Sequence, residues 1–275
     1  MFPHPQYTVA TPVALEGVGL HTGRTARVTI SPSERGSLTF IRNGHRFPVD
    51  VAQVSHTTRC TSIGGGDCGV STVEHLLASL SALNVTGADL GVDGPEIPIL
   101  DGSAAGFVRL LRQAGLREIP GNRRCLRITQ PVWLEEGACS LLAVPSETFR
   151  VTAGVSYRHP LVGVQMSDIV VGPETFEREV APARTFGFEE ELEELARRGL
   201  ALGGSLENAL VFFSDHTSSP LRFPDEPVRH KVLDVIGDLS LIGALPLVHV
   251  WAIRPSHKLN VAFARLLLES GEIIS

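Results

Sequence analysis

The sequence is poor in cysteine, with Cys60, Cys68, Cys125 and Cys139 in 275 residues and no Cys-x-x-Cys pair. Four cysteines at this spacing are too sparse for a disulfide scaffold. We therefore expect reduced and mostly buried thiols, and a fold that is stabilised by its hydrophobic core.

Basic runs and long apolar runs are also missing. The formal net charge is −6, which argues against nucleic acid as the main partner, although a small anionic substrate stays compatible with local Lys or Arg. No stretch reaches the roughly 18 to 20 apolar residues of a membrane span. Residues 1–5 carry neither a basic nor an apolar signal region, and no G-x-x-x-x-G-K-[ST] loop for a nucleotide triphosphate is present. We expect a cytoplasmic protein that is not integral to a membrane.

The composition suits one large domain or two of ordinary size, because 43% of the residues are hydrophobic. The character of the chain changes at residues 120–124, where Pro-Gly-Asn and two arginines precede a new strand. This break predicts a first domain over residues 1–122 and a second over residues 123–275.

Each half has the same order of predicted elements: strands, a helix that carries a histidine in its first turns, and a further strand. Helices are predicted after Ser71, and over residues 101–115, 189–198, 228–244 and 259–268; strands are predicted over residues 27–31, 37–42, 88–92, 149–155 and 247–253. We expect an α+β fold made by internal duplication, with the two histidine-bearing helices facing each other across a pseudo-twofold axis.

A polar stripe follows the predicted helix at residues 228–244. His230 and Asp234 differ by about 40° around the helix and Asp238 by about 80°, so all three share one face. A histidine and a carboxylate one turn apart can bind one metal ion. Taken alone, the pattern favours a surface His–Asp hydrogen bond with a Lys231–Asp234 ion pair.

A catalytic zinc ion needs three protein ligands, and His75, in the first turn of the other helix, is the best third candidate. Glu74 then stands where a metallohydrolase places its general base. The alternative is a capping box, in which Ser71 caps the helix and Glu74 bonds back to the Ser71 N–H. In isolation the capping box is favoured.

Six motifs alter this balance because they occur in the order and at the spacing of one family. They are GVGLHTG at 17–23, TVEHL at 72–76, EIPILDGS at 96–103, ARTFGF at 183–188, HK-x-x-D-x-x-x-D at 230–238 and SHKLN at 256–260. The chain resembles the UDP-3-O-acyl-N-acetylglucosamine deacetylases, zinc enzymes of lipid A synthesis in Gram-negative bacteria, from about Gly17 to about Leu268. The resemblance implies two similar α+β domains in a β-α-α-β layered sandwich, with the helices packed between two sheets.

The resemblance also implies a set of catalytic roles. The zinc ligands would be His75, His230 and Asp234, which places the metal at the domain junction. Glu74 would be the general base that activates water for attack on the acetamide, and Thr185 would stabilise the oxyanion. His257 would be an electrostatic stabiliser or the general acid toward the leaving amine. Asp238 would accept a hydrogen bond from His257, and Lys231 would contact the substrate.

An apolar channel for the acyl chain is implied as well, formed by an insert of the second domain at about residues 157–204. The positions that match the channel lining are Phe186, Phe188, Gly204 and Ala209, and ordinary core packing is the alternative for each. Leu20 and Cys60 match positions near the mouth of the site. Ser256 stands where the family usually has glycine before its histidine, and we expect a small shift of the backbone at His257.

The predicted activity is hydrolysis of the acetamide of the acylated sugar nucleotide, with Zn²⁺ as cofactor. Fe²⁺ also suits His/His/Asp ligation. The predicted partner is this small molecule, and we expect a monomer. Two alternatives stay open: a metal-dependent deacetylase of another N-acetyl sugar, and a non-catalytic protein that zinc stabilises.

Overall fold

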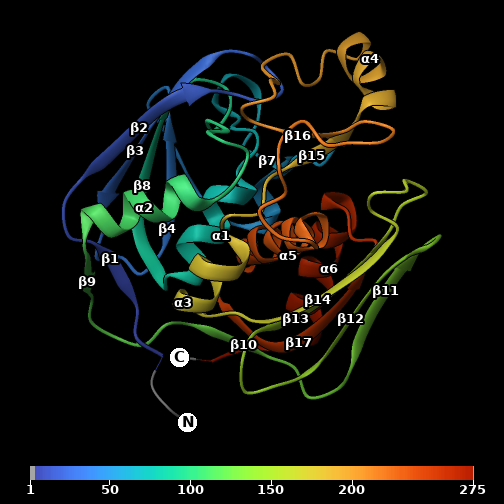
Figure 1. The fold of residues 1–275 in the computed structure, drawn as a ribbon. Helices are drawn as coiled ribbons and strands as arrows, with labels where there is room; N and C mark the ends of the chain where they lie inside the picture. The colour runs from blue at the N-terminus through green and yellow to red at the C-terminus, as the bar shows by residue number, and fades with distance from the viewer. Residues whose placement is uncertain (1–3, 275) are drawn as a thin grey trace.

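The computed structural model describes residues 4–274, so residues 1–3, on which the prediction of no signal peptide in part depends, lie outside the described residues. Within the described range no helix has the length and apolar character needed to span a membrane. Two seven-stranded sheets form the outer layers of the molecule (Figure 1).

The first sheet is built by the first part of the chain, in the order β2-β3-β8-β1-β9, with β4 joined to β8 and β5 joined to β4. Its strands are β1 (Tyr7–Val9), β2 (Val13–Val18), β3 (Thr25–Pro32), β4 (Leu38–Arg42), β5 (His45–Pro48), β8 (Val85–Asp93) and β9 (Leu116–Glu118). Between β5 and β8 the chain adds η1 (Val51–Gln53), β6 (Val54–His56), β7 (Ser62–Ile63), η2 (Gly66–Cys68) and the helix α1 (Glu74–Ala82).

The second sheet repeats this topology in the order β11-β12-β17-β10-β18, with β13 joined to β17 and β14 joined to β13. Its strands are β10 (Cys125–Arg127), β11 (Val132–Glu136), β12 (Cys139–Pro145), β13 (Arg150–Ser156), β14 (Val164–Val170), β17 (Leu245–Ile253) and β18 (Glu272–Ile274). The parallel pair β1–β8 recurs as β10–β17, and the parallel pair β4–β8 recurs as β13–β17. The expected duplication is therefore confirmed, and we propose the boundary between the repeats in the segment that joins β9 to β10.

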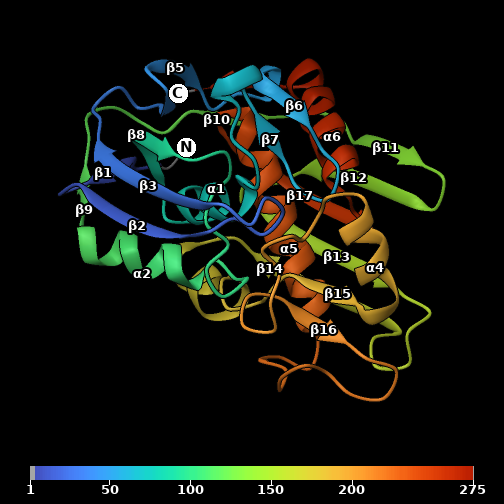
Figure 2. The same cartoon turned by 90° about the horizontal axis from the view of Figure 1, so that it is seen from above.

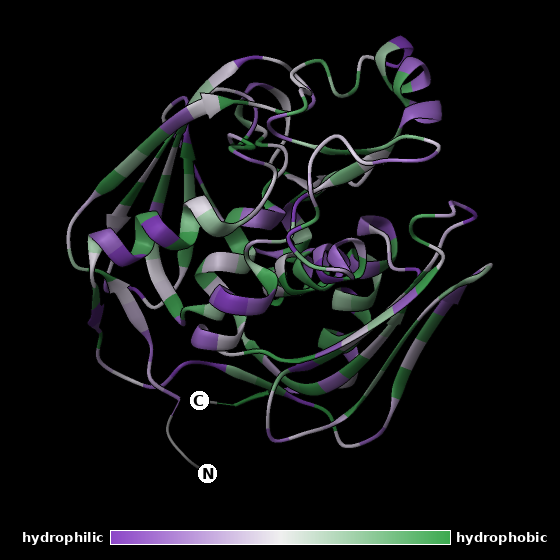
Figure 3. Ribbon diagram, viewed as in Figure 1, coloured by the Kyte–Doolittle hydropathy of each residue, from purple (hydrophilic) through white to green (hydrophobic). Residues whose placement is uncertain are grey.

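The helices lie between the two sheets, as the views from the front and from above show (Figures 1 and 2). They are α1, α2 (Ala105–Ala114), α5 (Glu226–Leu239) and α6 (His257–Ser270). A Cβ atom added at Gly237 of α5 would come within 2.2 Å of the carbonyl oxygen of Glu74 in α1. Glycine at this position lets the two central helices pack closely, and one continuous hydrophobic core fills the space between the sheets. Figure 3 shows hydrophobic residues, in green, along both sheets and along the helices between them.

The repeats differ most between β14 and α5, where the second repeat carries a long excursion. It contains α3 (Pro173–Thr175), the π-helical turn η3 (Phe176–Val180), β15 (Phe186–Phe188), α4 (Glu189–Arg197) and β16 (Leu210–Phe212). The helix α4 projects away from the layered body (Figure 1). The insert that the resemblance implied at about residues 157–204 overlaps β14, which belongs to the sheet, so the excursion begins later, after β14.

The predicted helices and strands are present, with two corrections. The helix predicted over 228–244 runs from Glu226 to Leu239 and is followed by η4 (Ser240–Ile242), because Gly243, at φ 70°, leaves the helical region. The capping box is wrong too, since the residue before α1 is Val73 and no side chain caps this end.

Candidate metal and active site

Three side chains from the two central helices converge at the junction of the repeats. His75 comes from the first turn of α1, and His230 and Asp234 come from α5, one turn apart. One potential ligand atom from each lies within 4.8 Å of the others. The three residues are almost wholly buried, so this group could hold a metal ion inside the protein.

The two histidines are in the neutral state that a metal requires. Their rings meet edge to face, with centroids 5.0 Å apart. Burial lowers the pKa of His75 to about 3, and burial also lowers the pKa of His230. The Nδ1 atom of His230 faces the Ala183 carbonyl oxygen at 3.1 Å. Because a carbonyl accepts only, Nδ1 carries the proton and Nε2, which lies 3.5 Å from Asp234 Oδ1, keeps its lone pair.

Asp234 is an ionised carboxylate with a cation beside it. Lys231 Nζ donates to Asp234 Oδ2 at 2.7 Å. Burial opposes ionisation of Asp234, but the positive charges of Lys231 and His257 outweigh burial and hold the pKa of Asp234 well below the ordinary value. The Lys231–Asp234 pair considered from the sequence therefore exists. It is not a surface feature, because Asp234 is buried and Lys231 lines the adjoining cavity.

Glu74 accepts a hydrogen bond from the Thr61 backbone N–H at 3.0 Å through Oε2. It is not available to Ser71, whose own backbone is engaged with Pro95 and Ile97. The carboxyl group is 3% exposed, and burial raises its pKa to about 7 despite the opposing effect of the His257 charge. A carboxyl group with this pKa exchanges protons near neutral pH, as general-base catalysis requires.

His257, the first residue of α6, faces Glu74 across the site. Its Nε2 atom lies 4.0 Å from Glu74 Oε1, and its Nδ1 atom lies 2.9 Å from Asp238 Oδ2. Burial would lower the pKa of His257, but the carboxylates of Asp238, Asp234 and Glu74 outweigh burial and raise it to about 10. The imidazole is therefore cationic near neutral pH.

Two further side chains, to which the sequence analysis assigned no role, hold Asp238 in place. Thr61 Oγ1 donates to Asp238 Oδ1 at 2.6 Å, and Asn260 Nδ2 donates to Asp238 Oδ2 at 2.8 Å. Asp238 is fully buried and does not line the cavity. It reaches the site through His257, and through Thr61, whose backbone N–H donates to Glu74.

A cavity of about 650 Å³ opens over these groups. Its polar end contains the three metal-ligand candidates together with Glu74, Thr185, Lys231 and His257. The part of its wall formed by α4 and the segment that follows it is mainly apolar, and we call this part the apolar branch. Its apolar side chains are Leu192, Leu195, Ala196, Leu200, Ala201, Leu206, Ala209 and Val211. One cavity therefore joins a reactive polar site to an apolar branch.

The channel residues implied by the motifs fall into two groups. Leu20, Phe186, Gly204 and Ala209 line the cavity. Phe188 does not, since its ring packs in a small separate core with Val162, Leu210 and Phe212. Cys60 does not line the cavity either; it is 4% exposed, and burial and the charge of Glu74 raise the pKa of its thiol to about 12. Both positions fit the core-packing alternative.

Ser256 does not disturb His257. Its φ of −138° is extended backbone that any residue adopts, and its hydroxyl accepts from the Leu259 N–H as the N-cap of α6. Serine is among the preferred N-cap residues. The shift expected from the sequence has no basis here, because no left-handed conformation calls for glycine.

Glu96 holds the GVGLHTG loop in place, a role that no pattern in the sequence predicted. Its fully buried carboxylate accepts from the backbone N–H groups of His21 and Thr22 and from the hydroxyls of Thr22 and Thr72. These bonds hold the loop against Thr72, two residues before Glu74. Arg59, also not anticipated, lines the cavity and pairs with Glu191 of α4.

Comparison with known proteins gives a consistent result over nearly the whole chain. A family model described as UDP-3-O-acyl N-acetylglycosamine deacetylase matches residues 6–269. The UDP-3-O-acyl-N-acetylglucosamine deacetylase of Syntrophotalea carbinolica is 42% identical over 274 residues, covering 97% of this chain and 89% of the relative. The protein of the same name from Nostoc is 41% identical over 274 residues, covering 96% of this chain and 98% of the relative.

Proposed function

The chain belongs to the UDP-3-O-acyl-N-acetylglucosamine deacetylase family, and we propose that it hydrolyses the acetamide of this substrate with the residues that meet at the junction of its two repeats. The observation that carries the proposal is the single cavity in which a His/His/Asp group, a Glu74–His257 pair and an apolar branch adjoin. The products are acetate and the free amine, in the pathway to lipid A.

The residues present fit a catalytic metal ion. Two neutral imidazoles and one carboxylate are the ligand types that Zn²⁺ favours, and three protein ligands leave a position open. Nδ1 of His75 is buried without a hydrogen-bond partner among the described residues, so the surrounding protein does not itself satisfy this ring. We propose Zn²⁺ held by His75, His230 and Asp234, with Fe²⁺ as the alternative that the same ligands accept. When bound, the ion would act as a Lewis acid on the amide carbonyl and lower the pKa of a water molecule.

The protein groups then divide the proton transfers. Glu74, as a carboxylate, takes a proton from the attacking water. The Thr185 hydroxyl, on the cavity wall, donates to the oxygen that becomes negative as the carbonyl is attacked. His257, as a cation, gives a proton to the departing amine when the C–N bond breaks. Asp238 keeps His257 charged, and Lys231 contacts the substrate beside Asp234.

The apolar branch explains why an acylated substrate would be preferred. Leucine and alanine side chains of α4 and its following segment line it, and burial of an acyl chain there removes apolar surface from water. A simple N-acetyl sugar has no acyl chain that could occupy this apolar branch. A purely structural zinc site would need neither Glu74 nor His257. The cytoplasmic location and the monomeric state stay predictions from the sequence.

The test is a comparison of two substrates with the purified, metal-loaded protein. UDP-N-acetylglucosamine is assayed with and without its 3-O-acyl group, and released amine is measured in both. We expect a much higher kcat/KM for the acylated form. Equal values would contradict the assigned substrate while leaving a deacetylase, and no amine from either would contradict the activity itself.

A further inference from the structure

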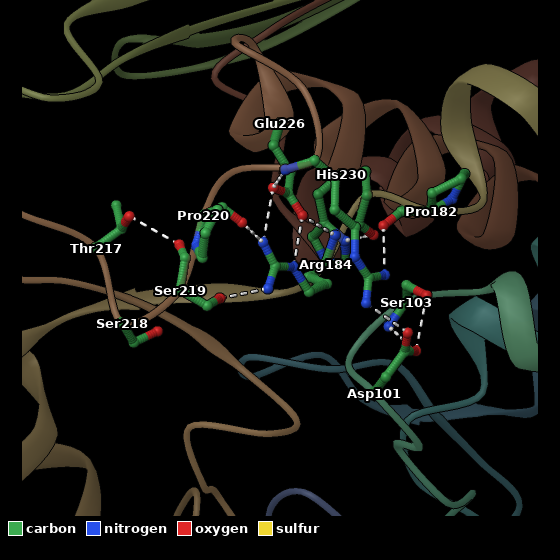
Figure 4. Close-up of polar contacts among 12 residues, drawn as sticks. Asp101, Ser103, Pro182, Arg184, Thr217, Ser218, Ser219, Pro220, Glu226 and His230 are labelled. Carbon is green, nitrogen blue, oxygen red and sulfur yellow. Dashed lines mark hydrogen bonds and ion pairs between the residues drawn. The ribbon is translucent and has the colours of Figure 1, made fainter.

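A buried ion pair lies directly behind the proposed metal and oxyanion sites. Arg184 Nε donates to Glu226 Oε1 at 2.8 Å and Arg184 Nη2 donates to Glu226 Oε2 at 3.1 Å (Figure 4). Glu226 is 0% exposed and Arg184 is 8% exposed. The remaining guanidinium donors reach the Ser219 hydroxyl at 2.6 Å and the Pro220 carbonyl at 2.9 Å.

The same carboxylate also binds the backbone. Glu226 Oε1 accepts from the Arg184 N–H at 3.0 Å, and Oε2 accepts from the Arg222 N–H at 2.8 Å. Because Glu226 is the first residue of α5, the start of the ligand-bearing helix is tied to the backbone of the ARTFGF segment at residue 184.

The two neighbours of Arg184 in the chain both face the reactive groups. The carbonyl of Ala183 is the partner of His230 Nδ1, and Thr185 is the proposed oxyanion donor. The backbone of Thr185 is held from both sides, since its N–H donates to Gly102 at 2.7 Å and its carbonyl accepts from Leu210 at 2.9 Å. A displacement of Arg184 would therefore move both the Ala183 carbonyl, which contacts His230, and the Thr185 hydroxyl.

A second ion pair extends the arrangement to the first repeat. Arg222 donates to the carbonyl of Pro182 at 2.9 Å and to Asp101 Oδ2 at 2.8 Å. Asp101 in turn accepts from the hydroxyl of Ser103. Residues of the first repeat, of the ARTFGF segment and of α5 are thus joined through these two arginines.

We propose that Arg184 and Glu226 are positioning residues that set the orientation of His230 through the Ala183 carbonyl and of the Thr185 hydroxyl through the backbone. This proposal rests on the proposed function. Both links matter because the partner of a ligating histidine fixes its tautomer and ring orientation, and oxyanion stabilisation depends on a donor fixed in advance.

An arginine–glutamate pair is better suited to hold this backbone in position than a lysine–glutamate pair would be. The planar guanidinium provides donors in fixed directions, and here they engage a carboxylate, a hydroxyl and a carbonyl at once. A lysine retains the charge but cannot make the two parallel bonds. Arg184→Lys therefore removes the geometry while leaving the cation, which separates positioning from electrostatics.

The experiment compares wild type with Arg184→Lys and with a matched control, Arg150→Lys. Arg150 forms a similar two-bond pair with Asp168, but both residues are substantially exposed and belong to β13 and β14. For each protein we would measure the visible absorption spectrum after Co²⁺ substitution, the Kd for Zn²⁺, and kcat and KM separately.

For Arg184→Lys we expect an altered Co²⁺ spectrum, a roughly 10- to 100-fold weaker Zn²⁺ affinity or kcat, as for other changes behind metal ligands, and little change in KM. Arg150→Lys should match wild type. A Co²⁺ spectrum, Kd and kcat for Arg184→Lys equal to those of wild type would overturn the positioning role. If Arg184→Lys does not fold, Glu226→Asp, which keeps the charge but shortens its reach, gives the same readouts. A wild-type protein that binds no metal would instead refute the proposed function.

Discussion

Nε2 of His257 lies 4.0 Å from Oε1 of Glu74 across the proposed reaction site. Burial raises the pKa of Glu74 to about 7, whereas the surrounding carboxylates outweigh burial and raise the pKa of His257 to about 10. The two groups are therefore a carboxylate and a cation in the pH range between these values. A base and an acid on opposite sides of one carbonyl give a bell-shaped pH profile.

Asp238→Asn should move the basic limb of this profile to lower pH. Asp238 is the strongest of the influences that raise the pKa of His257, and an amide carries no charge to replace it. If His257 must be protonated, activity is lost as the pH rises through its pKa, so a lower pKa makes the loss begin earlier. The measurement is kcat/KM against pH for wild type and variant.

Asp215→Asn provides the control for this shift, because the Asp215 side chain is 85% exposed and does not line the cavity. Its pH profile should overlay that of wild type. A basic limb that stays in place in Asp238→Asn would show that His257 is not the group that sets it.

Glu74→Gln should bind metal normally and lose most of its turnover. The substitution keeps the shape of the side chain and an oxygen for the Thr61 N–H, but an amide cannot take up a proton. Removal of a general base typically lowers kcat by about 100- to 10,000-fold. Metal content by elemental analysis and kcat on the acylated substrate are measured on the same sample.

His75→Ala gives the complementary result, because it removes one of the three candidate ligands. We expect the loss of both metal and activity. Full metal occupancy in His75→Ala would exclude the residue as a ligand, and unchanged turnover in Glu74→Gln would exclude it as the base.

The site illustrates what a sequence can and cannot predict. The helical period alone places His230, Asp234 and Asp238 on one face, and the structure has them there. The approach of His75 depends on the packing of α1 against α5, which no local pattern encodes. The need for a third ligand therefore made His75 a candidate, and the family motifs supplied the reason to place it in the set. The partners of Glu226 were not foreseen for the same reason, since Arg184 is 42 positions away.

The capping box is an error of a different kind, because here a local pattern predicts a contact that the fold does not form. Ser71 and Glu74 have the correct spacing for it, but tertiary contacts prevail, because Ser71 pairs with Pro95 and Ile97 and Glu74 turns toward Thr61. A local propensity worth about 1 kcal/mol gives way to the hydrogen bonds of a buried carboxylate. Phe188 was misplaced similarly, since it packs in the small core with Leu210 and Phe212, whereas Phe186, two residues earlier in β15, lines the cavity.

Ala209→Phe should reduce the use of the acylated substrate by closing the apolar branch. Ala209 lines the cavity, and a benzyl group there would occupy the space that the acyl chain needs. Overpacking of an apolar site typically costs about 1 to 3 kcal/mol, which corresponds to a roughly 5- to 150-fold lower kcat/KM. The unacylated sugar nucleotide should be affected much less.

Phe188→Ala is the contrasting variant, because Phe188 packs in the small core with Leu210 and Phe212 and does not line the cavity. We expect a loss of about 3 to 5 kcal/mol in the free energy of unfolding and an unchanged preference between the two substrates. A change of preference in Phe188→Ala but not in Ala209→Phe would reverse the assignment of the two positions.

Glu96→Gln should lower stability and loosen the GVGLHTG loop. The buried carboxylate accepts from the backbone of His21 and Thr22 and from two hydroxyls, whereas an amide would direct its NH₂ group at some of these donors. Hydrogen bonds to a buried charged group contribute about 1.5 to 3 kcal/mol each, so we expect a loss of about 2 to 4 kcal/mol, measured by urea unfolding. Hydrogen exchange should become faster at His21 and Thr22 while the amides of α6 keep wild-type rates. Unchanged exchange in the loop would mean that the strands flanking it, and not Glu96, hold it in place.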